Sequence, residues 1–280
     1  MNCLLDLHLH TRYSDGEKSP EALVKELKAN NVTHFSITDH DNIAPFEKIK
    51  RAALENDMHT FPGIEISSMY KGFETHILGY QFNWNSPGLK AFIKERIVFR
   101  KERALLILEQ LKKKGYQFDD RDIEGLIKAH YVGRPQIATL LFDYGYISEI
   151  GEAFSEEFIG DYSSEAITHK LKPAEEIICI IKKAGGLVFL AHPGLFNGEK
   201  GNSDGMNKYD IHRFHDFGID GLEVFHPNHT KSQIQRYLAL SKEKNLLISM
   251  GSDYHRGIYK TNQFAYNHCN YIKEVLSWLD

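Results

Sequence analysis

Two histidines near the start of the chain, His8 and His10, are the first residues whose type and spacing could support chemistry. They lie in and just after an apolar run from Cys3 to Leu9, which is typical of a short buried strand. Residues two apart on a strand point to the same side, so the two imidazoles share one face. Such a pair can hold one metal ion, and Asp15, on the Ser-Asp-Gly turn that follows, could reach a neighbouring ion.

Further ionisable side chains recur at the ends of predicted strands, which we expect over 32–37, 60–66, 73–82, 187–191, 221–225 and 246–250. An isolated pair of histidines would suit a solvated loop, but this repetition favours metal ligation. The candidate ligands are six imidazoles and three carboxylates: His8, His10, Asp15, His40, Glu65, His76, His192, Asp253 and His255. Nitrogen and oxygen ligands suit Mn, Fe, Zn, Co or Ni, and nine ligands suggest two or three ions.

Several divalent ions held by only three carboxylates keep a positive charge, which favours an anionic substrate such as a phosphate. Clustered ions stabilise the attacking and the leaving oxygen of a phosphoryl displacement. A hydroxide held by metal would then be the nucleophile. The chemistry therefore requires no Ser, Cys or Thr nucleophile, and we assign no catalytic side chain.

The composition is that of an ordinary globular protein of 280 residues, 42% hydrophobic and 26% charged, with a net charge of -4. No basic excess indicates long nucleic acid as a partner. The sequence shows neither a membrane-spanning apolar stretch nor a signal-peptide pattern, so we expect a cytoplasmic protein. Of three cysteines without CxxC spacing, Cys3 and Cys179 are expected to be buried free thiols. The excess of histidine, 15 residues, favours metal binding.

The predicted strands alternate with helices, which we expect over 20–30, 45–56, 174–184, 208–217 and 231–245. A stretch at 197–207 is expected to be a loop. This α/β alternation covers 1–99 and 171–280, whereas 100–170 contains only helical pieces, at 120–129, 134–144 and 148–159. Because candidate ligands follow nearly every strand, a closed parallel barrel is favoured over an open parallel sheet. We therefore expect a barrel domain with a helical insertion at 100–170.

Six segments in order, DLHLHTRYSDG, ITDHD, PGIEIS, THILGY, LAHPG and GSDYH, resemble the PHP (polymerase and histidinol phosphatase) family over 1–82 and 185–256. The resemblance implies a distorted (β/α)7 barrel that hydrolyses phosphate esters with three divalent ions, commonly Mn, Fe or Zn. It implies that one ion is held by His8, His10, Glu65 and Asp253. Glu65 would bridge to a second ion, shared with His76 and His192. The third ion would be held by Asp15, His40 and His255, and many relatives have His in place of Asp15.

Two more segments resemble a narrower subgroup with a helical insertion, which acts on nucleoside 3',5'-bisphosphates and the 5' ends of short RNA. The segment YVGRPQIA resembles the start of that insertion, where the Arg helps to bind phosphate, so Arg134 either contacts phosphate or is a surface residue at a helix start. The segment EVFHPNH resembles the subgroup's strand-end motif, and His226 and His229 either contact substrate or face solvent. Asp39 is expected to orient His40 rather than to bind an ion, and Asp6 is expected either to orient a ligand or to help close the barrel. The insertion is expected to cap the barrel mouth and to select the nucleotide.

The expected function is therefore metal-dependent hydrolysis of phosphate esters of nucleotides, with a small phosphorylated nucleotide or short RNA as the partner. A histidinol-phosphate phosphatase of the same family is one alternative, and it would need no insertion. A non-catalytic module that binds metal or nucleotide is the other, and the complete set of nine candidate ligands argues against it. The oligomeric state is left open.

Overall fold

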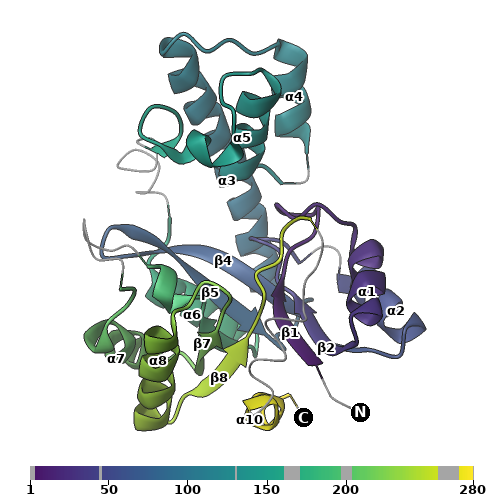
Figure 1. Ribbon diagram of the computed structural model, residues 1–280, viewed down its shortest axis with the longest axis vertical. Coiled ribbons are helices and arrows are strands. Elements are labelled where there is room, and N and C mark those ends of the chain that lie inside the picture. The colour runs from purple at the N-terminus through teal and green to yellow at the C-terminus, as the bar shows by residue number, and fades with distance from the viewer. Residues whose placement is uncertain are drawn as a thin grey trace. The chain divides into compact units, whose positions relative to one another are not determined.

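The computed structural model describes residues 4–43, 46–129, 131–160, 171–196, 204–257 and 271–279 (Figure 1). The chain divides into two compact units. One unit comprises Met1–Lys90 and Lys172–Asp280, and the other comprises Ala91–Leu171. No helix of the described residues is long and apolar enough to cross a membrane.

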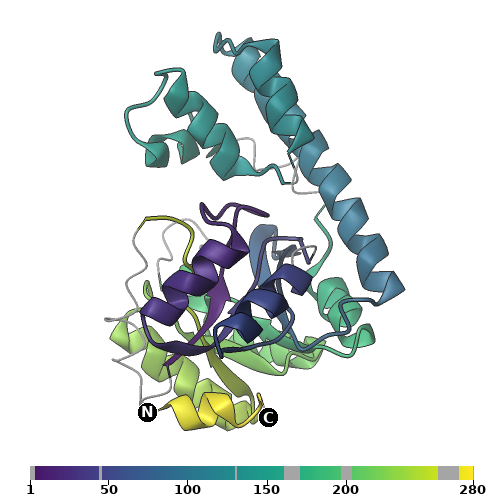
Figure 2. The same ribbon diagram turned by 90° about the vertical axis from the view of Figure 1, so that its right-hand side faces the viewer.

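The first unit begins with three parallel strands in the order β1 (Leu4–Leu9), β2 (Val32–Ile37) and β3 (His59–Thr60). Helices α1 (Pro20–Ala29) and α2 (Phe46–Glu55) make the crossovers that parallel neighbours require. The two helices lie side by side on one face of these strands, in purple and dark blue in Figure 2. α1 starts at Ser19, whose side chain accepts a hydrogen bond from the Ala22 amide, with proline in the first turn.

A second sheet contains β4 (Gly63–Tyr70), β5 (Phe73–Tyr80), β6 (Leu187–Leu190), β7 (Gly221–Phe225) and β8 (Leu247–Met250), in that order. Three helices follow the same alternation: α6 (Ala174–Lys183), α7 (Lys208–Phe217) and α8 (Lys231–Lys244). A short helix, α10 (Ile272–Leu276), contacts β8. The mixed α/β class predicted from the sequence is confirmed.

The expectation of a wholly parallel arrangement is wrong for β5, which runs antiparallel to both β4 and β6. Only Lys71 and Gly72 join β4 to β5, both at positive φ (51° and 83°), and a two-residue turn of this kind reverses the chain into a hairpin. The single strand predicted at 60–66 is also divided into β3 and β4. Pro62, which has no amide hydrogen to donate to a sheet, lies between them.

The two sheets meet at the carboxyl ends of β1 and β2. Leu9 bridges to Tyr254 beyond β8, and the His10 amide donates to the Tyr254 carbonyl at 3.0 Å. His40, beyond β2, bridges to Glu65 on β4, where the Asp41 amide donates to the Glu65 carbonyl at 2.8 Å. Backbone contacts therefore hold the ends of β1, β2 and β8 beside β4.

The second unit is helical in its described residues: most of α3 (Pro87–Lys113), α4 (Asp120–Lys128), α5 (Arg134–Asp143) and the 3₁₀ helix η1 (Ile150–Phe154). It has its own apolar core, which includes Leu111, Ile137 and Leu141. The helix predicted at 148–159 is reduced to η1. Gly151 inside it is a poor helix former.

Cys179 is exposed, so the prediction of a buried thiol is wrong at this position. It lies on the outer side of α6, which buries Ile177, Ile178 and Ile181 on its inner side. Cys3 and the first part of the predicted loop at 197–207 lie outside the described residues.

Leu27 and Leu54 offer a matched test of the packing of α1 and α2. Leu27 is fully buried in the core against β2, whereas Leu54 on α2 is 69% exposed. We expect Leu27→Ala to lower the free energy of unfolding by about 2–5 kcal/mol, because the truncation leaves a cavity. Leu54→Ala should change it by less than about 0.5 kcal/mol. Urea denaturation followed by circular dichroism measures both, and equal effects would contradict the packing described.

Candidate metal centre

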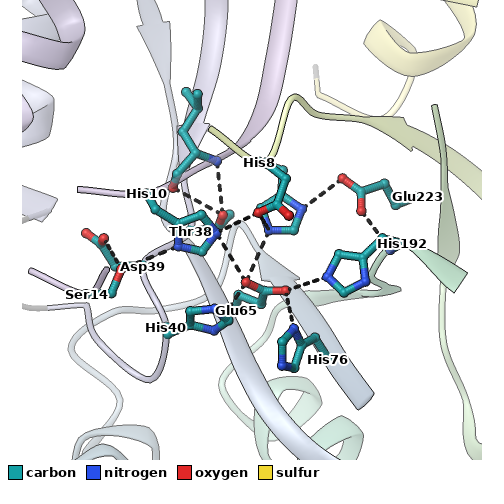
Figure 3. A network of polar contacts seen from close by, with 12 residues as sticks. His8, His10, Ser14, Thr38, Asp39, His40, Glu65, His76, His192 and Glu223 are labelled. Carbon is teal, nitrogen blue, oxygen red and sulfur yellow. Dashed lines mark hydrogen bonds and ion pairs between the residues drawn. The ribbon is translucent and has the colours of Figure 1, made fainter. Parts of the chain in front are cut away.

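All nine predicted ligands lie in the first unit and gather at one place, where strands of both sheets meet. Figure 3 shows His8, His10, His40, Glu65, His76 and His192 among them. His8 lies in β1 and His10 directly follows it, and neither side chain is exposed. Their rings share one face, as the strand period predicts, with centroids 5.2 Å apart. The others come from β4, β5 and the segments after β1, β2, β6 and β8: Asp15, His40, Glu65, His76, His192, Asp253 and His255.

The carboxylate of Glu65, only 1% exposed, is at the middle of the cluster. Its Oε2 lies 3.2 Å from nitrogens of three rings, those of His8, His10 and His40. Its Oε1 lies 2.9 Å from His76 Nδ1 and 3.0 Å from His192 Nε2. The two oxygens therefore face two different groups of imidazoles, as a carboxylate that bridges two ions would.

Two further carboxylates lie on either side of Glu65. Asp253 Oδ1 is 3.4 Å from His8 Nε2 and 3.1 Å from His10 Nε2. Asp15 lies within 3.7 Å of nitrogens of His10, His40 and His255. The two sets of rings overlap at His10.

Donor atoms within 4.8 Å of one another form three groups in the described chain. One contains His8, His10, Glu65 and Asp253, the set that the family resemblance implies for one ion. The second is Asp15, His40 and His255, again the implied set, with His10 added. The third contains Glu65, His76 and His40, and His192 contacts the same oxygen of Glu65 as His76 does.

Buried polar atoms that make no hydrogen bond show whether these residues could bind a metal. Five atoms of this kind lie near one another within the described residues, with contacts whose geometry is not that of a hydrogen bond: His8 Nε2, His10 Nε2, Asp15 Oδ1, Glu65 Oε2 and His76 Nδ1. A buried polar atom left in this way costs about 1–3 kcal/mol. Divalent cations would satisfy all five, since nitrogen and oxygen lone pairs that converge are what such ions bind. The residues therefore fit a cluster of divalent ions.

The electrostatics agree with that fit. Burial alone would lower the pKa of His10, but the carboxylates of Asp253 and Glu65 raise it to about 10. Burial opposes the same effect at His76, where Glu65 raises the pKa to about 10. Burial lowers the pKa of His40 to about 3, so this ring is neutral. Burial alone would also lower the pKa of His8, but the carboxylates of Glu223 and Glu65 raise it well above its usual value. In the absence of metal, protons on His8, His10 and His76 thus balance the carboxylates.

Asp6 and Asp39, predicted to orient ligands, bind backbone and hydroxyl groups near them. Asp6 Oδ1 accepts from the Ser252 amide at 2.9 Å and joins the start of the segment after β8 to β1. Asp39 accepts from the Thr11 amide, the Thr11 hydroxyl and the Ser14 hydroxyl, each at 2.7 Å. It therefore holds the turn between His10 and Asp15 rather than the ring of His40. Burial raises the pKa of Asp39 to about 6.

The predicted substrate residues have different surroundings. Arg134 is the first residue of α5, in the second unit, and is partly buried. His226 is buried after β7, with Nε2 3.4 Å from Asp253 Oδ2. His229 uses both nitrogens on the backbone. Nδ1 donates to the Val224 carbonyl at 2.9 Å, and Nε2 accepts from the Gly194 amide at 3.1 Å.

His229 is therefore neutral, and its burial lowers the pKa to about 4. This ring ties β7 to the segment after β6 and has no nitrogen left for a substrate. In the structure, His229 joins two backbone segments through its ring nitrogens. A contact with substrate stays a prediction for Arg134 and His226.

The sequence analysis missed Glu223. This side chain is fully buried on β7, with Oε1 2.9 Å from His8 Nδ1, and Oε2 accepts from the His192 amide at 2.7 Å. The indication in the sequence was a carboxylate in the otherwise apolar strand Gly221–Phe225, because a buried charge requires a partner.

Metal binding should release protons, because raised pKa values keep His8, His10 and His76 protonated near neutral pH in the metal-free protein. We expect about three protons per molecule at pH 7, and an apparent affinity for Mn²⁺ that rises with pH towards about 10. Isothermal titration calorimetry in buffers of different ionisation enthalpy measures the protons, and His76→Ala should release about one fewer. An enthalpy independent of the buffer would contradict this account.

Gly251 provides a steric test of the position of His8. A Cβ at Gly251 would lie 2.1 Å from the Cβ of His8 and 2.7 Å from its amide nitrogen, so β1 and the end of β8 approach closely only because this side chain is absent. We expect Gly251→Ala to weaken Mn²⁺ binding at least tenfold by displacing His8. Gly125→Ala, where a Cβ meets nothing within 4 Å, is the control. Equal Mn²⁺ affinities by equilibrium dialysis would refute the displacement.

Comparison with known proteins identifies the family to which a chain with this geometry belongs. The model of the family described as "PHP domain" matches residues 6–121. A 5'-3' exoribonuclease of Haemophilus influenzae is 31% identical over 250 residues, which cover 89% of this chain and 89% of the relative. A 3',5'-nucleoside bisphosphate phosphatase of Chromobacterium violaceum is 25% identical over 257 residues, which cover 90% of this chain and 87% of the relative.

Among solved structures, a metal-dependent phosphoesterase of Bifidobacterium adolescentis superposes with a TM-score of 0.80 at 26% identity. The match covers 98% of this chain and 95% of that one. Sequence and fold thus agree over nearly the whole chain. The chain belongs to the PHP domain family and is a metal-dependent hydrolase of phosphate esters.

Proposed function

We propose that the chain hydrolyses phosphate esters of nucleotides, either nucleoside 3',5'-bisphosphates or the 5' ends of short RNA, at a centre of three divalent ions. The observation that carries the proposal is Glu65, a buried carboxylate whose two oxygens face two groups of imidazoles. The ions are proposed to be Mn, Fe or Zn, because every donor is nitrogen or oxygen.

The ligands divide into three sets. His8, His10, Glu65 and Asp253 hold the first ion, Glu65 with His76 and His192 holds the second, and Asp15 with His40 and His255 holds the third. Such ions lower the pKa of bound water and neutralise charge on a phosphoryl group. We also propose that the two sheets close into the family's distorted (β/α)7 barrel, supported by the bridges Leu9–Tyr254 and His40–Glu65.

The residues of the chain fix the geometry that this chemistry needs. Asp39 and Asp6 hold the backbone on either side of His8 and His10, so the two rings have little freedom to turn away. The backbone at His192 (φ 25°) and Asp253 (φ 51°) lies in the left-handed region, at the points where β6 and β8 end. Such conformations persist where surrounding contacts enforce them, and they are common at active sites.

A nucleotide substrate is favoured over histidinol phosphate by two observations. Relatives that match over most of their length are named for RNA or for a nucleoside bisphosphate. The chain also has the helical unit at 91–171, in which we propose that Arg134 binds a phosphate bidentately. A non-catalytic module is disfavoured because all nine ligand residues are in place.

The test is phosphate release by the Mn-loaded protein. It compares a nucleoside 3',5'-bisphosphate, a nucleoside 5'-monophosphate, a short 5'-phosphorylated RNA and histidinol phosphate. We expect turnover of the bisphosphate or the RNA, a loss of at least 100-fold in His192→Ala, and no loss in His212→Ala, whose ring pairs with Glu243 on the surface. Arg134→Ala should raise KM for the substrate with two phosphates and leave the monophosphate less affected.

Each outcome has a distinct meaning. Preference for histidinol phosphate would leave the metal centre standing and refute the nucleotide assignment. Metal that binds without release of phosphate from any of the four would favour the binding module. Equal loss of activity in His192→Ala and His212→Ala would show that the candidate centre is not the site of hydrolysis.

A further inference from the structure

We infer that Glu223 is a positioning residue of the metal centre, which orients the ring of His8 and fixes the backbone of His192 at the same time. The inference rests on the proposed metal centre and adds to it a residue that binds no ion. Glu223 lies on β7, between the strands that precede His192 and Asp253 in the sheet order. Figure 3 shows its carboxylate between His8 and His192.

The first contact determines which nitrogen of His8 faces the centre. Glu223 Oε1 is 2.9 Å from His8 Nδ1, and a carboxylate can only accept, so Nδ1 carries the proton. His8 Nε2 lies on the other side of the ring, 3.2 Å from Glu65 Oε2 and 3.4 Å from Asp253 Oδ1, and it is the nitrogen that would give its lone pair to an ion once its own proton is released. Glu223 thus sets the tautomer that a metal ligand requires.

The second contact acts on the backbone. Glu223 Oε2 accepts from the His192 amide at 2.7 Å, at a residue whose φ of 25° is rare for a side chain other than glycine. In this conformation His192 Nε2 lies 3.0 Å from Glu65 Oε1. The rings of His8 and His192 lie stacked, with centroids 5.7 Å apart. One carboxylate therefore fixes two candidate ligands that are far apart in the sequence.

Both oxygens of Glu223 accept a hydrogen bond, so a substitution by glutamine tests whether two acceptors are needed. An amide of the same shape has one acceptor and one donor group. Its NH₂ could face the amide of His192, which is itself a donor, or His8 Nδ1, which accepts only when the proton of the ring is on Nε2. Glu223→Gln therefore keeps the volume of the core but loses either the contact with His192 or the His8 tautomer that a metal ligand requires.

A matched control exists on the surface. Glu243 Oε1 pairs with His212 Nε2 at 3.0 Å, with both side chains partly or fully exposed. Glu243→Gln is the same chemical change to the same kind of pair, away from the candidate centre. It controls for the loss of a carboxylate–imidazole contact as such.

The experiment measures metal binding directly. Wild type, Glu223→Gln and Glu243→Gln are stripped of metal, checked by circular dichroism and titrated with Mn²⁺ by equilibrium dialysis with metal analysis. Loss of a group that orients a metal ligand lowers affinity by about 10–100-fold, and we expect this for Glu223→Gln alone. Affinity and stoichiometry equal to those of wild type would overturn the inference. A wild type that binds no Mn²⁺ would instead refute the proposed metal centre.

A double-mutant cycle separates positioning from general stability. In a His8→Ala background, we expect Glu223→Gln to weaken Mn²⁺ binding much less than in wild type, because one of the two rings it acts on is gone. An undiminished effect would show that Glu223 does not act through His8.

A second measurement uses only the wild-type protein, so its result does not depend on whether a variant folds. In the Zn²⁺-loaded wild-type protein, ¹⁵N NMR of the histidine rings reports which nitrogen of His8 is protonated. We expect a proton on Nδ1 and metal on Nε2. Metal on Nδ1, or a ring without bound metal, would overturn the assignment of Glu223.

Discussion

The contact of one buried carboxylate with several imidazoles is the constraint on which the candidate centre depends. Glu65 is almost completely buried, and its two oxygens face nitrogens of five histidines. Burial alone would raise the pKa of this carboxyl, but the imidazoles around it, that of His8 among them, hold the pKa well below its usual range. The five rings come from β1, from β5 and from the segments that follow β1, β2 and β6, so the centre forms only where strands of both sheets meet.

Much of the centre could be predicted from the sequence because strand period and residue type act locally. The alternation in β1 places His8 and His10 on one face in any fold that forms this strand. Contacts between strands that are far apart in the sequence could not be predicted from strand period and residue type. The partners of Glu223 lie 215 and 31 positions away, so its spacing carries no information about them.

The fold shows the same division. Helices and parallel strands of the first unit were predicted within a few residues, since their apolar period reflects burial on one face. The direction of β5 depends on two turn residues, Lys71 and Gly72, which no apolar pattern records. For His229, the family motif suggested a substrate contact, whereas the structure shows a ring with both nitrogens on the backbone. A sequence motif therefore identifies which residues belong to a site, but it does not show which groups each residue contacts.

The closure of β1 onto the segment after β8 has a consequence for folding. The hydrogen bond from the Ser252 amide to Asp6 spans 246 positions, and the first set of ligands joins His8 to Asp253. During synthesis, the first strand must therefore wait for nearly the whole chain before its imidazoles meet their carboxylate partner. The helical unit at 91–171, with its own core, can fold in the interval. Contacts of such long range form late, so the capacity to bind metal is acquired at the end of folding.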